Sequence, residues 1–138
     1  VRTFSKIYGL ASLRIGYYVT QNKQFSEYFT IYTVSGLSVK AALLALDDKK
    51  RYDETFAYIK NAKDKVTNAA KASNLKYIES DANFVTLLTT ASQREKIVIE
   101  LQKKSYSFAA AGKSAFLRIT LASAKELQDA IQSMAVVK

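Results

Sequence analysis

Apolar residues recur at helical or at alternating spacing along most of the chain, and the two spacings predict different elements. Apolar positions three or four residues apart indicate one face of a helix, whereas alternate positions indicate a half-buried strand. Helical spacing favours helices over residues 22–30, 38–47, 50–73, 92–104 and from residue 123 onward. Alternating or β-branched runs favour strands over residues 1–4, 13–20, 76–79, 83–89, 106–108 and 115–121.

The stretch 50–73 is the longest of the predicted helices. Its apolar side chains fall on one side of the helix, and they are Tyr52, Phe56, Ile59 and Val66. Asn74 follows as a residue that commonly ends a helix. The Ala- and Leu-rich stretch 38–47 also reads as a helix, and we expect it to be mostly buried.

The stretch 115–121 alternates regularly between two faces. As a strand it would place Leu117, Ile119 and Leu121 on one face and Phe116, Arg118 and Thr120 on the other. Serine followed three residues later by glutamate predicts a capping box that opens a helix. Two such pairs are present, Ser92 with Glu95 and Ser123 with Glu126.

Taken in chain order, these elements predict an α+β fold. Helices come first, and a strand–strand–helix–strand–strand–helix series follows. Such a series favours helices packed on one face of a mainly antiparallel sheet. At 138 residues the chain makes one domain or part of a longer protein, and 49% hydrophobic residues suffice for a core.

The sequence contains neither histidine nor cysteine, which excludes several kinds of chemistry. Disulfides and thiolate metal sites need cysteine, and histidine is the commonest metal ligand and general base. We therefore expect no metal site and no Ser-His or Cys-His catalytic pair.

The net charge of +9 raises the question of a nucleic-acid partner. The lysines and arginines are scattered along the predicted helices beside aspartate and glutamate. That pattern is typical of solvated helix faces, so we expect no nucleic-acid partner. Because no run of about 18 apolar residues is present, and no signal-peptide pattern either, we expect a soluble cytoplasmic protein without a membrane partner.

The most informative motif is the first segment, which reads VRTFSKIYGLASLRIGY over residues 1–17. It places Lys6 after the hydroxyl residues Thr3 and Ser5, with Arg14 further along. Pyridoxal phosphate needs such a set, because it bonds covalently to a lysine and carries a phosphate that hydroxyls and a cation can bind. That lysine must lose its proton, which burial or a nearby cation such as Arg14 would favour.

The segment resembles the lysine motif of fold-type I aminotransferases. Among these it is most similar to histidinol-phosphate aminotransferases and their close relatives, which read R-T-F-S-K-x-Y-G-L-A-G-L-R-x-G-Y. The resemblance implies that Lys6 is the catalytic lysine bound to pyridoxal 5'-phosphate and that Arg14 binds the cofactor phosphate. It also implies that Thr3 and Ser5 lie near this phosphate. Ser12 departs from the family glycine, which bears on the local turn.

Three further segments resemble the same family. S-D-A-N-F over residues 80–84 is similar to the family's S-x-A-N-F, and residues 33–46 are similar to its interdomain segment. F-L-R-I-T-L over residues 116–121 is similar to L-R-I-[ST]-[IV]-G, whose arginine binds the substrate α-carboxylate as a bidentate pair. The resemblance thus assigns Arg118 to substrate binding. Ala122 replaces the family glycine, and the arginine–proline step usual upstream is absent.

The resemblance also implies a domain organisation. Residues 1–20 would be the lysine-bearing segment of the large cofactor-binding domain, and residues 21–138 would be the C-terminal small domain. The family's aspartate at the pyridine nitrogen, its stacking aromatic ring and its phosphate loop all precede the lysine. We therefore expect the chain to be the C-terminal portion of a longer enzyme and to be inactive alone.

The expected reaction is transamination, in histidine or other amino-acid biosynthesis. The donor would be histidinol phosphate or an aromatic amino acid, the 2-oxo acid acceptor would be 2-oxoglutarate, and the full-length protein would be a homodimer. Two alternatives stay open. One is a phosphothreonine-type decarboxylase of the same superfamily, and the other is a non-catalytic basic α+β binding module.

Overall fold

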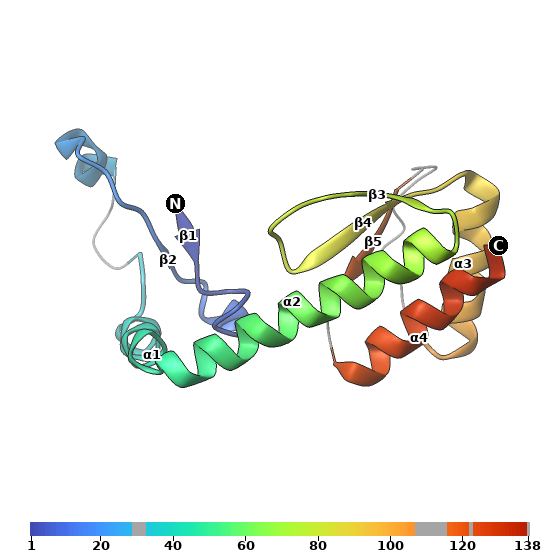
Figure 1. The fold of residues 1–138 in the computed structure, drawn as a ribbon. Helices are drawn as coiled ribbons and strands as arrows, with labels where there is room; N and C mark the ends of the chain where they lie inside the picture. Colours follow the sequence, from blue (N-terminus) through green and yellow to red (C-terminus); the bar gives the residue numbers. More distant parts are fainter. Residues whose placement is uncertain (29–32, 107–115, 122, 138) are drawn as a thin grey trace. The chain divides into compact units, whose positions relative to one another are not determined.

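The computed structural model describes residues 1–28, 33–106, 116–121 and 123–137. The chain forms two compact units, Val1–Ala57 and Tyr58–Lys138 (Figure 1). The expected division into residues 1–20 and 21–138 concerns the two domains of a longer enzyme and stays a prediction.

The first unit is built around a short hairpin, and it shares one long helix with the second unit. Its described elements are β1 (Arg2–Thr3), η1 (Ala11–Leu13), β2 (Gly16–Tyr17), η2 (Lys23–Tyr28), α1 (Gly36–Asp47) and the start of α2 (Lys49–Ala72). β1 and β2 are antiparallel, with Arg2 opposite Tyr17 and Thr3 opposite Gly16. The hairpin therefore closes the chain between these strands into a loop.

The second unit combines a three-stranded sheet with helices. Its described elements are the rest of α2, β3 (Lys76–Ile78), β4 (Phe84–Leu88), α3 (Ala91–Lys103), β5 (Phe116–Thr120), α4 (Ala124–Met134) and η3 (Ala135–Val137). The strands lie in the order β3, β4, β5, and both neighbouring pairs are antiparallel.

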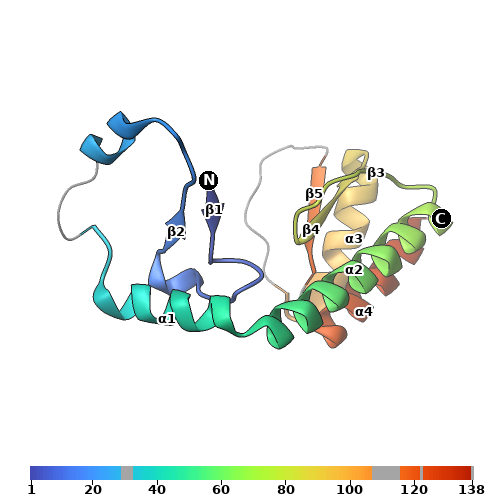
Figure 2. The same cartoon turned by 60° about the vertical axis from the view of Figure 1, so that its left-hand side comes forward.

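The core of the second unit lies between one face of the sheet and the helices (Figure 2). On that face Val85 and Leu87 of β4 lie opposite Ile119 and Leu117 of β5, and all four are buried. Three helices complete the core with the buried residues Ala62, Val66, Ala70, Ile97, Leu101, Leu127, Ala130 and Met134. The alternate positions of β5 are exposed. The expected α+β fold, with helices on one face of an antiparallel sheet, is confirmed.

The long helix and its end also agree with the sequence pattern. α2 spans Lys49–Ala72, close to the predicted 50–73. Asn74 follows it with a left-handed φ of 53°, and the Leu75 amide donates to the Ala70 carbonyl at 2.9 Å. This arrangement satisfies carbonyls that the helix end would leave without partners.

Helix α1 departs from the expectation that the stretch 38–47 is mostly buried. Only Ser38 and Ala42 are buried in α1, and its exposed large apolar residues are Leu37, Val39, Leu43, Leu44 and Leu46. The prediction is wrong for a geometric reason. The apolar residues surround nearly the whole circumference of the helix, and the described residues of the first unit cover one side of it.

The start of α3 differs from the predicted capping box at Ser92. The N-cap is Thr90, whose hydroxyl accepts from the Gln93 amide at 3.2 Å, and the Gln93 side chain accepts from the Thr90 amide at 2.9 Å. Ser92 lies inside the first turn. The second predicted box is confirmed, because Ser123 caps α4 and exchanges hydrogen bonds with Glu126.

Several predicted elements are shorter than expected. The strand predicted over 13–20 is reduced to Gly16–Tyr17, because residues 11–13 form a 3-10 turn. The helix predicted over 22–30 is a 3-10 helix over Lys23–Tyr28, and residues 29 and 30 lie outside the described residues. Tyr106 is not in a strand, and residues 107 and 108 also lie outside the described part.

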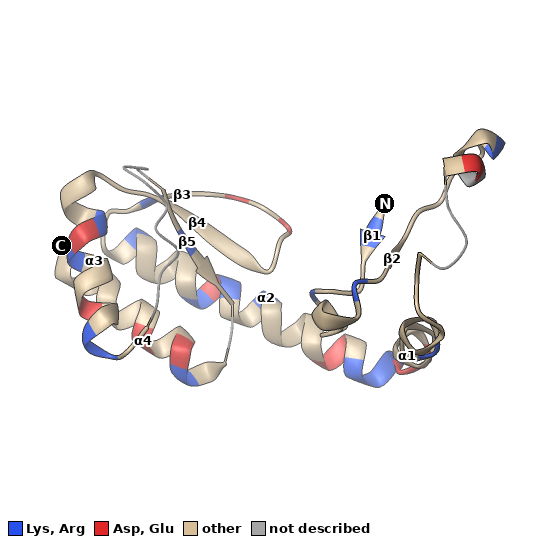
Figure 3. Cartoon of the chain, turned by 180° about the vertical axis from the view of Figure 1, so that it is seen from behind, with Lys and Arg blue, Asp and Glu red and all other residues tan. Residues whose placement is uncertain are grey.

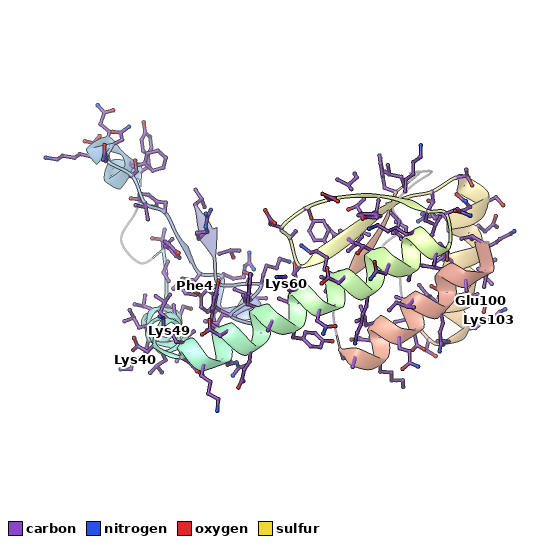
Figure 4. The ribbon with its side chains drawn as sticks, in the orientation of Figure 1. Phe4, Lys40, Lys49, Lys60, Glu100 and Lys103 are labelled. Carbon is purple, nitrogen blue, oxygen red and sulfur yellow. The ribbon has the colours of Figure 1, made fainter. Side chains whose placement is uncertain are left out.

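Charged residues of both signs lie along α2 and α4 (Figure 3). Exposed pairs such as Glu100 with Lys103, labelled in Figure 4, lie one helical turn apart. Such pairs are typical of solvated helix faces. Among the described helices, none is both long and apolar enough to span a bilayer.

Candidate functional site

Lys6 lies in a loop that backbone hydrogen bonds close at its base. The Phe4 amide donates to the Ile15 carbonyl at 3.2 Å, and the Leu10 amide donates to the Phe4 carbonyl at 2.9 Å. A tight turn follows Lys6, because the Gly9 amide donates to the Lys6 carbonyl at 2.9 Å. Gly9 has a φ of 70°, which glycine adopts without strain. The side chain of Lys6 is exposed, so the described residues supply no burial for it.

Phe4 packs this loop against aromatic residues of the first unit. Its side chain is 3% exposed and lies at the base of the hairpin (Figure 4). The Phe4 ring lies 5.0 Å from the ring of Tyr8 and 5.6 Å from that of Tyr17. Tyr8 continues the contact to α2, where the ring of Tyr52 lies 5.5 Å away. Burial, and then the neighbouring Tyr52, raise the pKa of the Tyr8 hydroxyl.

Thr3 and Ser5 offer hydroxyl groups on the strand and loop that lead to Lys6. The Thr3 hydroxyl oxygen accepts from the Ser5 amide at 3.1 Å. A hydroxyl that accepts one hydrogen bond still has its own hydrogen to donate. Thr3 is exposed and Ser5 is half-buried. Both hydroxyls can therefore donate to an anion bound beside the loop.

Arg14 ends the turn η1 rather than lying in a strand as the sequence predicted. Its backbone is left-handed, with a φ of 49°, and its Nη1 donates to the Ala11 carbonyl at 2.9 Å. The preceding residue is fixed by α1, because the Ser38 hydroxyl donates to the Leu13 carbonyl at 2.9 Å. The guanidinium is exposed and keeps further donors free.

A cavity of about 320 Å³ lies beside this loop within the first unit. Residues 7–10 of the loop line it, together with side chains of α1 and of the start of α2. Asp48, Arg51 and Tyr52 are among these lining residues. The loop thus has apolar and polar surface next to it, on the side of the helices.

Arg118 belongs to the second unit, whereas Lys6, Arg14, Thr3 and Ser5 belong to the first. It lies on β5 opposite Thr86 of β4, on the sheet face that the helices leave open. Its guanidinium carbon lies 5.0 Å from the centre of the Phe84 ring. Arg118 is exposed and shares a face of β5 with Phe116 and Thr120, as the alternation over 115–121 predicted for these three residues.

Within the described part of the chain, the three cations Lys6, Arg14 and Arg118 pair with no carboxylate. An exposed cation without an anionic partner can bind a phosphate or a carboxylate from a ligand. The described residues also form no group of acidic residues that could hold a metal ion. Lys6 and Arg14 in the first unit, and Arg118 in the second unit, can therefore each bind an anionic group of a ligand.

Sequence reasoning missed three residues that contact these groups or the chain beside them. Tyr8 joins the loop to α2, Ser38 fixes the chain before Arg14, and Phe84 lies against Arg118. Tyr8 lies in the motif over residues 1–17 and Phe84 in the segment over residues 80–84, and their aromatic rings were the available signal. Nothing in the sequence connects Ser38 with residue 13, because the contact spans many residues of the chain.

Comparisons of the sequence and of the structure with known proteins indicate the same family. Residues 1–134 match the profile of the family described as aminotransferase class I and II. A histidinol-phosphate aminotransferase of Campylobacter hominis is 37% identical over 95 residues, which are 67% of this chain and 26% of that protein. The histidinol-phosphate aminotransferase of Thermotoga neapolitana is 26% identical over an alignment that covers 100% of this chain and 42% of that protein.

A solved structure extends this similarity to the fold. The crystal structure of histidinol-phosphate aminotransferase from Sinorhizobium meliloti, in complex with pyridoxal-5'-phosphate, matches with a TM-score of 0.78 and 30% identity. The match covers 99% of this chain and 39% of that chain. This chain thus spans less than half the length of the relatives it matches. Since the family profile covers nearly every residue, the chain belongs to the aminotransferase class I and II family.

Proposed function

We propose that this chain is the C-terminal part of a pyridoxal-phosphate-dependent aminotransferase that moves an amino group from histidinol phosphate to 2-oxoglutarate. The observation that carries the proposal is the closed loop that presents Lys6, with the hydroxyls of Thr3 and Ser5 and the guanidinium of Arg14 on the same segment. The names of the relatives and the cofactor in the solved structure support it. They favour aminotransfer over the decarboxylase and over a non-catalytic binding module.

The charges of the described residues fit this cofactor and this substrate. The cofactor carries a phosphate, and an amino-acid substrate or its 2-oxo acid product carries a carboxylate. Lys6, Arg14 and Arg118 have no carboxylate partner among the described residues. Histidinol phosphate brings a phosphate of its own in place of the carboxylate, so Arg118 would meet an anion with either substrate.

The lysine-bearing loop would hold the cofactor and move a proton. When bound, pyridoxal phosphate withdraws electrons from the substrate α-carbon and makes its proton acidic. The Lys6 amine would bond to the cofactor before substrate arrives and then, once released, would take the proton from the α-carbon. Arg14 would bind the phosphate oxygens through two N–H groups, and Thr3 and Ser5 would donate to the same oxygens.

The rest of the proposal concerns the whole protein. Residues 1–20 would belong to the large cofactor-binding domain and residues 21–138 to the small domain. The full-length protein would be a cytoplasmic homodimer. Its partners would be the amino donor and the 2-oxo acid.

Product formation by the purified full-length protein tests the reaction. With pyridoxal phosphate, histidinol phosphate and 2-oxoglutarate, we expect glutamate to form, and to form faster than with phenylalanine or tyrosine as the donor. Carbon dioxide release that does not need 2-oxoglutarate would replace the proposal by decarboxylation. A colourless protein that forms no product with any donor would replace it by the binding module.

A further inference from the structure

The contact between Arg118 and Phe84 is built into the register of the sheet. Arg118 lies directly opposite Thr86, and Phe84 lies opposite Thr120. Phe84 is therefore the diagonal neighbour of Arg118 on the same face of the sheet, within reach of a long side chain. The guanidinium carbon of Arg118 lies 5.0 Å from the centre of the Phe84 ring, inside the range of a cation–π interaction.

The strand pairing holds Phe84 itself in place. β4 pairs with β5 along its whole length, and one further hydrogen bond closes the end next to Phe84. There the Leu121 amide donates to the Asn83 carbonyl at 2.9 Å. Phe84 is half-buried on this central strand. The ring is therefore a fixed support for a side chain that has several rotatable bonds.

The ring supports Arg118 without using its hydrogen-bonding capacity. An aromatic face attracts a guanidinium through its quadrupole, and this attraction needs no hydrogen bond from its N–H groups to an oxygen acceptor. In the described part of the chain, no carboxylate competes for those groups. The guanidinium can thus be held in one place while its donors stay free for a ligand anion.

We propose that Phe84 is a positioning residue that orients Arg118 for the anion of the substrate. This inference rests on the proposed function, in which Arg118 binds that anion. Binding would be tighter because less side-chain freedom is lost when substrate arrives. An orientation that serves bound substrate and transition state alike changes KM and leaves kcat nearly constant.

Steady-state kinetics of the full-length holoenzyme test the role of Phe84. Phe84→Ile removes the ring and keeps a side chain suited to a strand. We expect it to raise KM for the amino donor about 2- to 30-fold, the range of a lost cation–π contact, with kcat nearly unchanged. Phe84→Leu provides a second ring-free variant, and Phe84→Tyr should restore most of the affinity because it keeps the ring. Ile78→Ala, on the same sheet face, is the control for lost apolar surface.

A double-mutant cycle separates this inference from the proposed function. On the background of Arg118→Ala, Phe84→Ile should raise KM no further, because residues that act through one contact have non-additive effects. If Arg118→Ala raises KM and neither ring-free variant does, the role of Phe84 is wrong and the proposed function stands. If Arg118→Ala leaves KM unchanged, the assignment of Arg118 is wrong. A fall in kcat without a change in KM, or an additive effect in the cycle, would also overturn the positioning role.

Discussion

At the scale of single residues, the shape of the lysine-bearing loop depends on where side chains are absent. Gly9 takes a left-handed φ of 70° in the turn after Lys6. Gly16 faces Thr3 across the hairpin, and a Cβ there would lie 2.6 Å from the Arg2 carbonyl oxygen. The motif therefore fixes the loop through its two glycines as well as through Phe4.

Replacing Gly16 tests this packing argument. Gly16→Ala should destabilise the hairpin by about 1–3 kcal/mol, because backbone atoms must move to admit the methyl group. Hydrogen exchange at the Phe4 amide should then become about 5- to 150-fold faster. Gly36→Ala is the matched control, since a Cβ there meets nothing within 4 Å. Equal exchange rates in the two variants would contradict the argument.

A second prediction concerns the contribution of the Asp129 carboxyl to the stability of the folded protein, and how this contribution depends on pH. Hydrogen bonds from Lys104 and Tyr106 hold the pKa of the Asp129 carboxyl below its usual value of 3.8. A carboxyl whose pKa is lower in the folded state stabilises the protein above its unfolded-state pKa. That stability is lost as the pH falls below this value and through the lower folded-state pKa.

Thermal unfolding of Asp129→Asn should show this pattern. The variant should melt at a lower temperature than the parent chain near neutral pH, and the difference should shrink as the pH falls below 3.8. Asp64→Asn, at an exposed position of α2, is the control and should shift the melting temperature little. A difference in melting temperature that grows toward low pH would contradict the lowered pKa of the Asp129 carboxyl.

At the scale of elements, the alternation of residues along a strand predicted the structure better than the capping motifs predicted where helices start. The alternation over 115–121 placed Arg118 on the strand face opposite to that of Leu117 and Ile119, because successive residues of a strand point to opposite faces. In the structure the face of Arg118 is the exposed one. Helix starts were harder to place. Thr90 with Gln93 and Ser92 with Glu95 both satisfy the capping pattern, and only the path of the chain after β4 selects Thr90.

The two candidate caps of α3 differ in a measurable way. Thr90→Ala removes the hydroxyl that accepts from the Gln93 amide and should lower the free energy of unfolding by about 1 kcal/mol. Ser92→Ala should change it by less than about 0.5 kcal/mol, since Ser92 is exposed inside the first turn. Urea denaturation of both variants provides the comparison. A larger loss for Ser92→Ala would favour the cap that the sequence predicted.

At the scale of the whole molecule, the sequence predicted the class of the fold and the family, and it did not predict how α1 is covered. The exposed Leu43 and Leu44 belong to a helix that is apolar on most sides, and the described residues of the first unit reach one side of it. The spacing of apolar residues indicates which side chains are suited to burial, but it does not indicate which other residues cover them. The functional roles of the predicted site residues also stay predictions, because those roles depend on a cofactor and a complete site. These residues are Lys6, Arg14, Thr3, Ser5 and Arg118.

The chain by itself should not catalyse aminotransfer. It spans 39% of the solved relative that carries the cofactor, and catalysis by this cofactor needs orientation and electronic tuning of its ring by surrounding residues. We expect the 138-residue chain, incubated with pyridoxal phosphate and histidinol phosphate, to react no faster than free cofactor. A faster reaction that Lys6→Ala abolishes would show that this chain holds a complete site.

The most direct test of the role proposed for Lys6 is the position of the cofactor on the full-length protein. Borohydride reduction fixes pyridoxal phosphate to the lysine that carries it, and mass spectrometry of the peptides then locates the adduct. We predict an adduct on Lys6 that Lys6→Ala removes and that Lys40→Ala, at an exposed lysine of α1, leaves in place. An adduct on another lysine, or one that survives Lys6→Ala, would contradict it.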